Sequence, residues 1–212
     1  MKKIPENTLV KYRYVIPMSD RIDTIKNIIN KWTKKYVDKI YFGQLMLLVS
    51  PIYTYKDNIF VQPVIDVDAP FNEAFRYVKN FLSKDNRKKH WIAEFTGKTS
   101  FHLISNFAII LDKGITLPEI RKIVYEPLKL KNEYVDIISS IRDMPFVRIG
   151  YRQETKKLAF PVLDFSMNFI RKNINQLTFK NVFKNTNELA EYIRNWIFPR
   201  FYIKEDEYVR YI

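Results

Sequence analysis

The sequence contains no cysteine, four glycines and only two histidines among its 212 residues. Without cysteine there can be no disulfide, no thiolate zinc site and no catalytic thiol, so no zinc is expected. The chain also lacks serine- and glycine-rich tracts, tandem repeats, a secretory signal with a cleavage site, and any apolar run of membrane-spanning length. We therefore expect one cytoplasmic domain over residues 1–212, with no membrane partner. This domain is either a whole protein or the core of a longer one.

The chain carries an excess of positive charge. Lysine and arginine number 36 against 23 aspartates and glutamates, which gives a formal net charge of +13. Such a balance attracts polyanions, because contacts to phosphate groups release counterions. Nucleic acid is therefore an expected partner. The alternative is a basic surface that serves solubility or meets an acidic protein or a membrane surface.

The hydrophobic pattern predicts strands and helices that intermix along the chain, within a composition that is 47% hydrophobic and able to bury a core. Strands are expected over residues 8–16, 44–53, 59–67, 91–95, 101–111, 146–150 and 158–163, and helices over residues 20–36, 70–82, 117–125 and 187–196. Short polar turns join several neighbouring strands, as in antiparallel hairpins. Hairpins mixed with helices favour the α+β class.

Two aspartates, Asp66 and Asp68, end an apolar segment that reads Val-Ile-Asp-Val-Asp. On a strand, residues i and i+2 point to the same face, so these carboxylates would lie side by side. Adjacent carboxylates repel one another, and a hard divalent cation relieves that repulsion. The pair is a candidate site for Mg²⁺ or Mn²⁺. Alternatively, both aspartates lie at an exposed strand end and cap the helix that starts near Pro70.

A small basic turn, Thr-Gly-Lys-Thr, precedes Ser-Phe-His at residues 100–102. Ser100 and His102 would share a strand face, so the hydroxyl and the imidazole can converge on one anion. Lys98 and the backbone N–H groups of the turn add positive potential where a triphosphate could lie. The alternative for His102 is a partly buried histidine bonded to a backbone carbonyl.

A third segment begins at Asp136, which follows apolar residues and precedes a stretch rich in arginine and lysine. Arg148 and Lys156 belong to this stretch, whose density of cations suits phosphate oxygens. The alternative is an ordinary basic hairpin. Asp164 also follows apolar residues and is a second candidate for the third carboxylate.

In their order and spacing, the three segments resemble the archaeo-eukaryotic primase superfamily, which includes primase-polymerases and the polymerase domains of bacterial end-joining ligases. That family has two aspartates, two residues apart, on a strand, then a basic turn with Ser-x-His, then an aspartate followed by a basic segment. The resemblance covers about residues 43–163. It implies a two-lobed catalytic core of mixed and antiparallel sheets, in which an RRM-like lobe and an αβ lobe flank an acidic cleft.

The resemblance implies a template-directed nucleotidyltransferase, a DNA primase or a DNA/RNA polymerase, in which Asp66, Asp68 and Asp136 bind two Mg²⁺ or Mn²⁺ ions. Asp136 is preferred to Asp164 because the basic stretch follows Asp136, as in the family. The residues implied for nucleotide binding are Lys98, Ser100, His102, Arg148 and Lys156.

The implied partners are a single-stranded DNA or RNA template, a primer and an NTP or dNTP substrate. Helicases or other replication, repair or CRISPR proteins are further partners that the family suggests. Two other functions use the same residues. One is a non-catalytic module that binds single-stranded nucleic acid, and the other is a two-metal nuclease.

Overall fold

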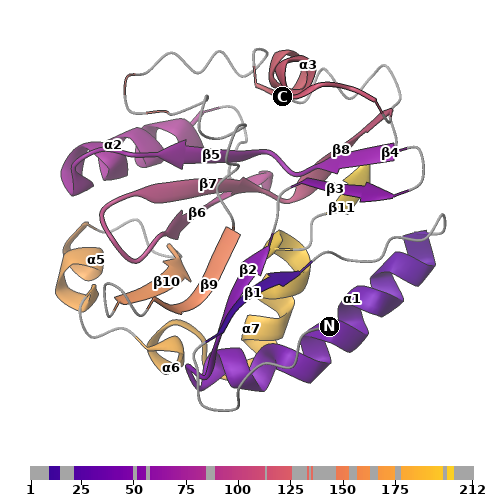
Figure 1. Ribbon diagram of the computed structural model, residues 1–212. Coiled ribbons are helices and arrows are strands. Elements are labelled where there is room, and N and C mark those ends of the chain that lie inside the picture. The colour runs from indigo at the N-terminus through magenta and orange to yellow at the C-terminus, as the bar shows by residue number, and fades with distance from the viewer. Residues whose placement is uncertain are drawn as a thin grey trace.

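The structure of the protein is a computed structural model. It describes residues 10–14, 22–49, 52–55, 58–84, 89–112, 114–125, 133, 135, 147–152, 157–162, 167–174, 178–197 and 200–202. These residues form two β-sheets with helices packed on them (Figure 1). The predicted α+β class is confirmed. No helix within the described ranges is both long enough and apolar enough to cross a membrane.

The larger sheet has seven strands in the order β1-β2-β9-β10-β6-β7-β5. In that order the strands are β1 (Val10–Tyr14), β2 (Leu45–Val49), β9 (Val147–Arg152), β10 (Lys157–Pro161), β6 (Trp91–Phe95), β7 (Phe101–Ser105) and β5 (Val64–Val67). Strands β1 and β2 are parallel, and every other neighbouring pair is antiparallel. Among the described residues the sheet is therefore mixed, and its parallel pair lies at one edge.

The smaller sheet has four strands in the order β11-β8-β4-β3. These are β11 (Arg200–Tyr202), β8 (Phe107–Asp112), β4 (Asn58–Val61) and β3 (Ile52–Tyr55). Strand β11 runs parallel to β8, while β8–β4 and β4–β3 are antiparallel. The β3–β4 hairpin is thus extended on one side by segments from the middle and the end of the chain.

Three strands predicted as continuous are each divided between the two sheets, so those predictions were wrong in length. Residues 44–53 contain β2 and the start of β3, residues 59–67 contain β4 and β5, and residues 101–111 contain β7 and β8. At the second division Pro63 has no N–H to continue a ladder, and its carbonyl accepts a hydrogen bond from the Ser105 N–H at 3.1 Å. At the third, the Asn106 N–H donates to the His90 carbonyl at 2.9 Å. The backbone therefore exchanges partners where it changes sheets.

Gln62 lies where the chain passes from β4 to β5, and its side chain links the passage from β7 to β8 to the C-terminal helices. Its side chain is fully buried, and its Nε2 donates to the Ser105 carbonyl at 2.7 Å and to the Trp196 carbonyl at 2.8 Å. Trp196 lies in a π-helical turn, η3 (Ile193–Ile197). One amide group thus satisfies carbonyls from a strand end and from a helix end, as buried polar groups require.

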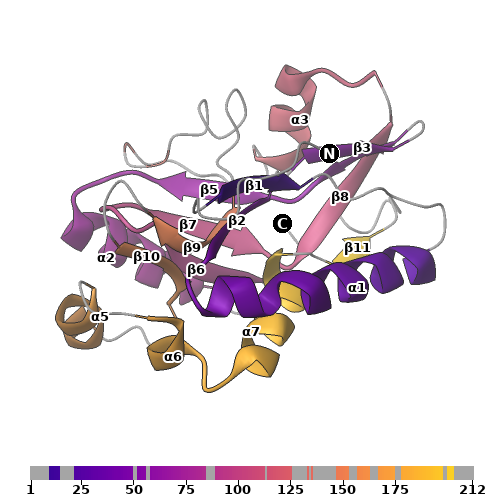
Figure 2. The same ribbon diagram turned by 60° about the horizontal axis from the view of Figure 1, so that its bottom comes forward.

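The helices are α1 (Ile22–Tyr41), α2 (Phe71–Leu82), α3 (Leu117–Val124), α5 (Met167–Asn173), α6 (Phe179–Val182) and α7 (Thr186–Tyr192), which continues into η3. Helix α2 packs on β5, β6 and β7 through a buried face that includes Phe75 and Val78. Figure 2 shows α1 beside α7, which it contacts. The predicted helices over residues 20–36, 70–82, 117–125 and 187–196 match α1, α2, α3 and α7 with η3, although α1 extends to Tyr41.

Candidate functional site

Three polar residues lie opposite one another on the neighbouring strands β5, β7 and β6. Asp66 is the register partner of His102, and His102 is the register partner of Glu94. Side chains of directly opposed residues in antiparallel strands point to the same face of a sheet. The structure therefore brings the first and second predicted motifs together in one row, which we call the polar row: Asp66, His102 and Glu94.

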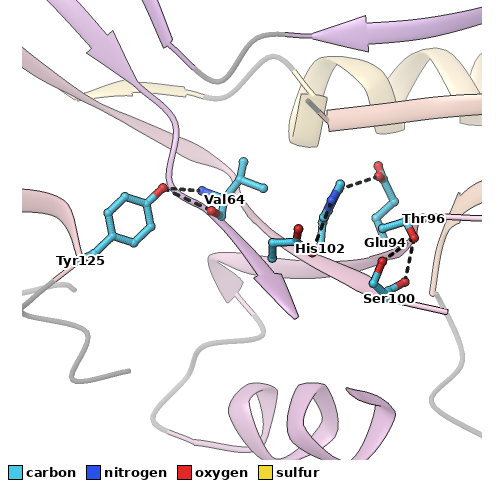
Figure 3. Close-up of polar contacts among 7 residues, drawn as sticks. Val64, Glu94, Thr96, Ser100, His102 and Tyr125 are labelled. Carbon is cyan, nitrogen blue, oxygen red and sulfur yellow. Dashed lines mark hydrogen bonds and ion pairs between the residues drawn. The ribbon is translucent and has the colours of Figure 1, made fainter. Parts of the chain in front are cut away.

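His102 occupies the centre of the polar row with its side chain 3% exposed. Its Nδ1 lies 3.3 Å from Glu94 Oε1, and its Nε2 lies 3.8 Å from Asp66 Oδ1. Figure 3 shows the ring of His102 reaching Glu94. The second of these distances is longer than a hydrogen bond but within ion-pair range. A buried histidine was the predicted alternative, but its partners here are carboxylates and not a backbone carbonyl.

The next row of the same three strands is apolar and faces α2. Val67, Phe101 and Phe95 are register partners, and all three are fully buried. The ring of Phe71, in α2, lies 5.6 Å from Phe101 and 6.1 Å from Phe95 between centroids. Because successive side chains of a strand alternate between faces, the polar row points away from α2.

Tyr192, the last residue of α7, is close enough to Glu94, the buried end of the polar row, to be affected by its charge. Burial raises the pKa of the Tyr192 phenol, and the negative charge of Glu94 raises it further. The Tyr192 side chain is buried, and its hydroxyl oxygen makes no hydrogen bond to any described residue. Helix α7 thus packs on the same side of the sheet as the Glu94 carboxylate.

The two aspartates of the first motif lie at the C-terminal end of β5 and are accessible to solvent. The Asp66 side chain is 26% exposed, and Asp68, one residue beyond the end of β5 at Val67, is exposed. Carboxylates with this access suit a hard divalent cation. The alternative role as helix caps does not match the start of α2, where the N-cap is Pro70 and no side chain makes a capping hydrogen bond.

Val135, the residue that precedes the third motif, lies beside β5 on the edge opposite β7. Val135 is buried and forms an antiparallel β-bridge with Val67, the residue between the two aspartates. Asp136 directly follows Val135 in the chain and lies outside the described residues, as do Asp164 and Lys156. The backbone that leads into the third motif is therefore placed beside the first motif.

The basic turn closes the β6–β7 hairpin in a five-residue loop. The Thr96 N–H donates to the Ser100 carbonyl at 3.1 Å, and the two hydroxyl oxygens lie 2.8 Å apart (Figure 3). Gly97 has a φ of 78°, a conformation that glycine adopts without steric cost. Lys98 is exposed at the tip, whereas Ser100 is half-buried. Of the predicted nucleotide contacts in this turn, the lysine has the greater access to an anion.

Arg148 belongs to a different part of the sheet. It lies in β9, opposite Leu48 of β2, and β10 and β6 separate β9 from β7. The described residues do not join Arg148 to the polar row.

Within the described ranges, no three histidine or acidic side chains are grouped so that they could hold a metal ion. The chemistry of the donors at the end of β5 still fits a hard cation, because Asp66 and Asp68 offer carboxylate oxygens at a partly exposed position. A further ligand would come from outside the described residues, and Asp136 follows the residue that bridges to Val67.

Glu94 and Tyr192 were not predicted as site residues. Glu94 is the one acidic residue in the otherwise apolar strand Trp-Ile-Ala-Glu-Phe, which is a signal that the sequence carries. Its significance depends on the register of the β6–β7 hairpin, which places it opposite His102. Tyr192 reaches the site by packing between distant segments, and no local pattern marks it.

Fold and site together define an α+β protein in which a row of two carboxylates and an imidazole crosses the edge of a mixed sheet. No protein-family model, curated protein or solved structure matches the chain.

Proposed function

We propose that the protein is a metal-dependent, template-directed nucleotidyltransferase, a primase or polymerase of the kind that the archaeo-eukaryotic primases represent. One observation carries this proposal. Asp66 of the first motif and His102 of the second, which are far apart in the sequence, are direct register partners in adjacent strands. The β-bridge between Val67 and Val135 supports it further, because Val135 directly precedes the third motif in the chain.

In this proposal Asp66, Asp68 and Asp136 hold two Mg²⁺ or Mn²⁺ ions. Bound divalent ions activate the attacking 3′-hydroxyl and neutralise the charge of the triphosphate. The role of the chain itself is to orient the carboxylates and to hold the nucleotide by charge and hydrogen bonds. Lys98, which is exposed at the tip of the hairpin turn, is the best placed of the predicted phosphate contacts among the described residues.

Arg148 and Lys156 are proposed as further phosphate contacts, and the net charge of +13 supports binding of a single-stranded template. We further propose that the two sheets belong to the two lobes of a primase-polymerase core on either side of an acidic cleft. The crossings of the chain between the sheets at Pro63 and Asn106 are compatible with that arrangement.

The decisive experiment is nucleotide incorporation on a single-stranded template with Mn²⁺, with and without a primer, using labelled NTPs or dNTPs. The wild-type protein should lengthen a primer or synthesise one. Asp66→Asn and Asp68→Asn, which keep the side-chain shape but remove the charge, should lower incorporation to the level seen without metal. Asp38→Asn is the matched control, because Asp38 is an exposed aspartate on α1.

Template binding and circular dichroism should be the same in all three variants, since exposed or partly exposed carboxylates contribute little to folding. Full activity in Asp66→Asn would refute the proposal. Metal-dependent shortening of the labelled strand would identify a nuclease instead. Template binding without either reaction in Mn²⁺ or Mg²⁺ would identify a non-catalytic binding module.

A further inference from the structure

The imidazole of His102 has a carboxylate at each of its two nitrogens. Nδ1 faces Glu94 at 3.3 Å and Nε2 faces Asp66 at 3.8 Å, and the side chain is 3% exposed. An ionised carboxylate can only accept hydrogen bonds, so a hydrogen on Nδ1 serves the contact with Glu94, and a hydrogen on Nε2 serves the longer ion-pair contact with Asp66. In this arrangement both nitrogens of the ring face carboxylates.

We propose that Glu94 and His102 are positioning residues that fix the carboxylate of Asp66 for metal binding, and that neither touches the nucleotide. This inference rests on the proposed function, since it treats Asp66 as a metal ligand. It differs from the role that the family resemblance implies for His102, which is a direct contact to the phosphates of the incoming nucleotide.

Glu94 is the fixed end of the polar row. It is fully buried, and the register partner beyond it is Pro161, a buried apolar residue of β10. Burial of a carboxylate costs free energy unless hydrogen bonds and charge compensate for it. The contact with Nδ1 of His102 offers such compensation, and it also holds the imidazole in one orientation.

Asp66 is the open end of the polar row. Exposure of the side chain rises from 0% at Glu94 and 3% at His102 to 26% at Asp66. The ring of His102 therefore lies behind the Asp66 carboxylate, on the side away from solvent. Partners behind a ligand restrict its orientation, and their loss typically lowers metal affinity by about 10- to 100-fold.

The test compares Glu94→Gln, His102→Asn and the double variant with the wild-type protein. Mn²⁺ binding is measured without nucleotide, from the electron paramagnetic resonance signal of the free ion. Each single variant should bind Mn²⁺ about 10-fold or more weakly. The double variant should bind no more weakly than the single variants, because both residues act through one contact. Glu94→Asp, which keeps the charge but shortens the reach, should fall between wild type and Glu94→Gln.

Incorporation kinetics provide the second readout. At saturating Mn²⁺ the KM for the nucleotide should be unchanged in Glu94→Gln and His102→Asn. The comparator is Lys98→Ala, which should raise that KM without changing Mn²⁺ binding. Thr33→Val is the control for disturbance of a buried polar residue, because Thr33 is fully buried in α1, which carries no residue of the polar row. It should leave both readouts unchanged.

A raised nucleotide KM with unchanged Mn²⁺ affinity in His102→Asn would overturn the inference and restore a phosphate contact. Wild-type Mn²⁺ affinity in a folded Glu94→Gln or Glu94→Asp variant would overturn it too. Failure of this inference can be distinguished from failure of the proposed function. If the wild-type protein makes strands but Glu94→Gln binds Mn²⁺ normally, positioning fails and nucleotidyl transfer stands. If Glu94→Gln weakens Mn²⁺ binding but no strand is made, positioning stands and the proposed function fails.

Discussion

The phenol oxygen of Tyr125 lies 3.2 Å from the carbonyl oxygen of Val64 and 3.4 Å from its amide nitrogen, so a single side chain bonds both backbone groups at the start of β5. Strand β5 pairs with β7 on one edge, and on its other edge it meets Tyr125 at Val64 and Val135 at Val67. The strand that carries Asp66 is therefore held on both sides at each end.

Tyr125→Phe should destabilise the fold because it leaves these two buried backbone groups without the phenol. We expect a loss of about 1–3 kcal/mol in the free energy of unfolding, which is typical for a buried group left unsatisfied. Urea denaturation followed by circular dichroism measures it. Tyr41→Phe is the matched control: its hydroxyl contacts the Phe183 carbonyl at 3.3 Å in a partly exposed position, and its loss should cost less. Equal costs in the two variants would contradict this account.

Gln62→Met should destabilise the junction between the sheets. The substitution keeps the length of the side chain but removes the donor that bonds Ser105 and Trp196. One buried and one partly buried carbonyl lose a partner, so we expect a loss of about 2 kcal/mol. Thermal unfolding measures it, with Ser83→Ala as control, because the Ser83 hydroxyl bonds the nearby Asn80 carbonyl in an exposed position. A melting temperature equal to wild type would show that the junction does not depend on Gln62.

The sequence predicted elements whose signals are local. Helix α2 follows Pro70 and repeats apolar residues at helical spacing, and β6 is a short apolar run, so both were found close to their observed bounds. The divisions of the longer strands were missed. Apolar alternation continues through residues 59–67 and 101–111, whereas the change of sheet depends on bonds such as that from Ser105 N–H to the Pro63 carbonyl. Such bonds join segments that no local pattern relates.

The same distinction holds for the candidate site. Alternation placed Asp66 and Asp68 on one face and the family resemblance associated them with His102, and the strand register does bring Asp66 and His102 together. Glu94 was missed because one acidic residue in a strand has no significance until the hairpin register is known. The sheet order leaves Arg148 in β9, separated from His102 in β7 by two strands.

Helix α7 depends on a capping arrangement that can be tested separately. The Asn185 side chain accepts hydrogen bonds from the Asn187 N–H at 3.0 Å and the Glu188 N–H at 3.1 Å, and the Glu188 carboxylate accepts from the Lys184 N–H at 2.8 Å. Asn185→Ala should cost about 1 kcal/mol, and Asn185→Asp should cost little because aspartate caps equally well. Urea denaturation of the two variants measures the difference. Equal losses would indicate that the cap does not stabilise the helix.

Tyr125 and Tyr192 should respond in opposite ways to replacement by phenylalanine at neutral pH, although burial raises the pKa of both phenols above the ordinary value of 10.0. The Tyr192 hydroxyl is buried and makes no hydrogen bond to any described residue, whereas that of Tyr125 bonds Val64. Tyr192→Phe should therefore leave the free energy of unfolding at pH 7 unchanged or raise it by about 1 kcal/mol, while Tyr125→Phe lowers it.

At alkaline pH, Tyr125→Phe and Tyr192→Phe should share a second effect, which is a change in how the free energy of unfolding depends on pH. A phenol whose pKa is raised by folding does not affect the pH dependence of stability below the pKa of the unfolded chain, about 10. As pH rises above that value the free energy of unfolding falls, because the unfolded chain ionises first. Each variant removes one such phenol, so its stability should fall less steeply than that of wild type between about pH 10 and 11. Urea denaturation at a series of pH values measures both slopes. A Tyr192→Phe slope equal to wild type would mean that this phenol ionises as readily in the folded protein as in the unfolded chain.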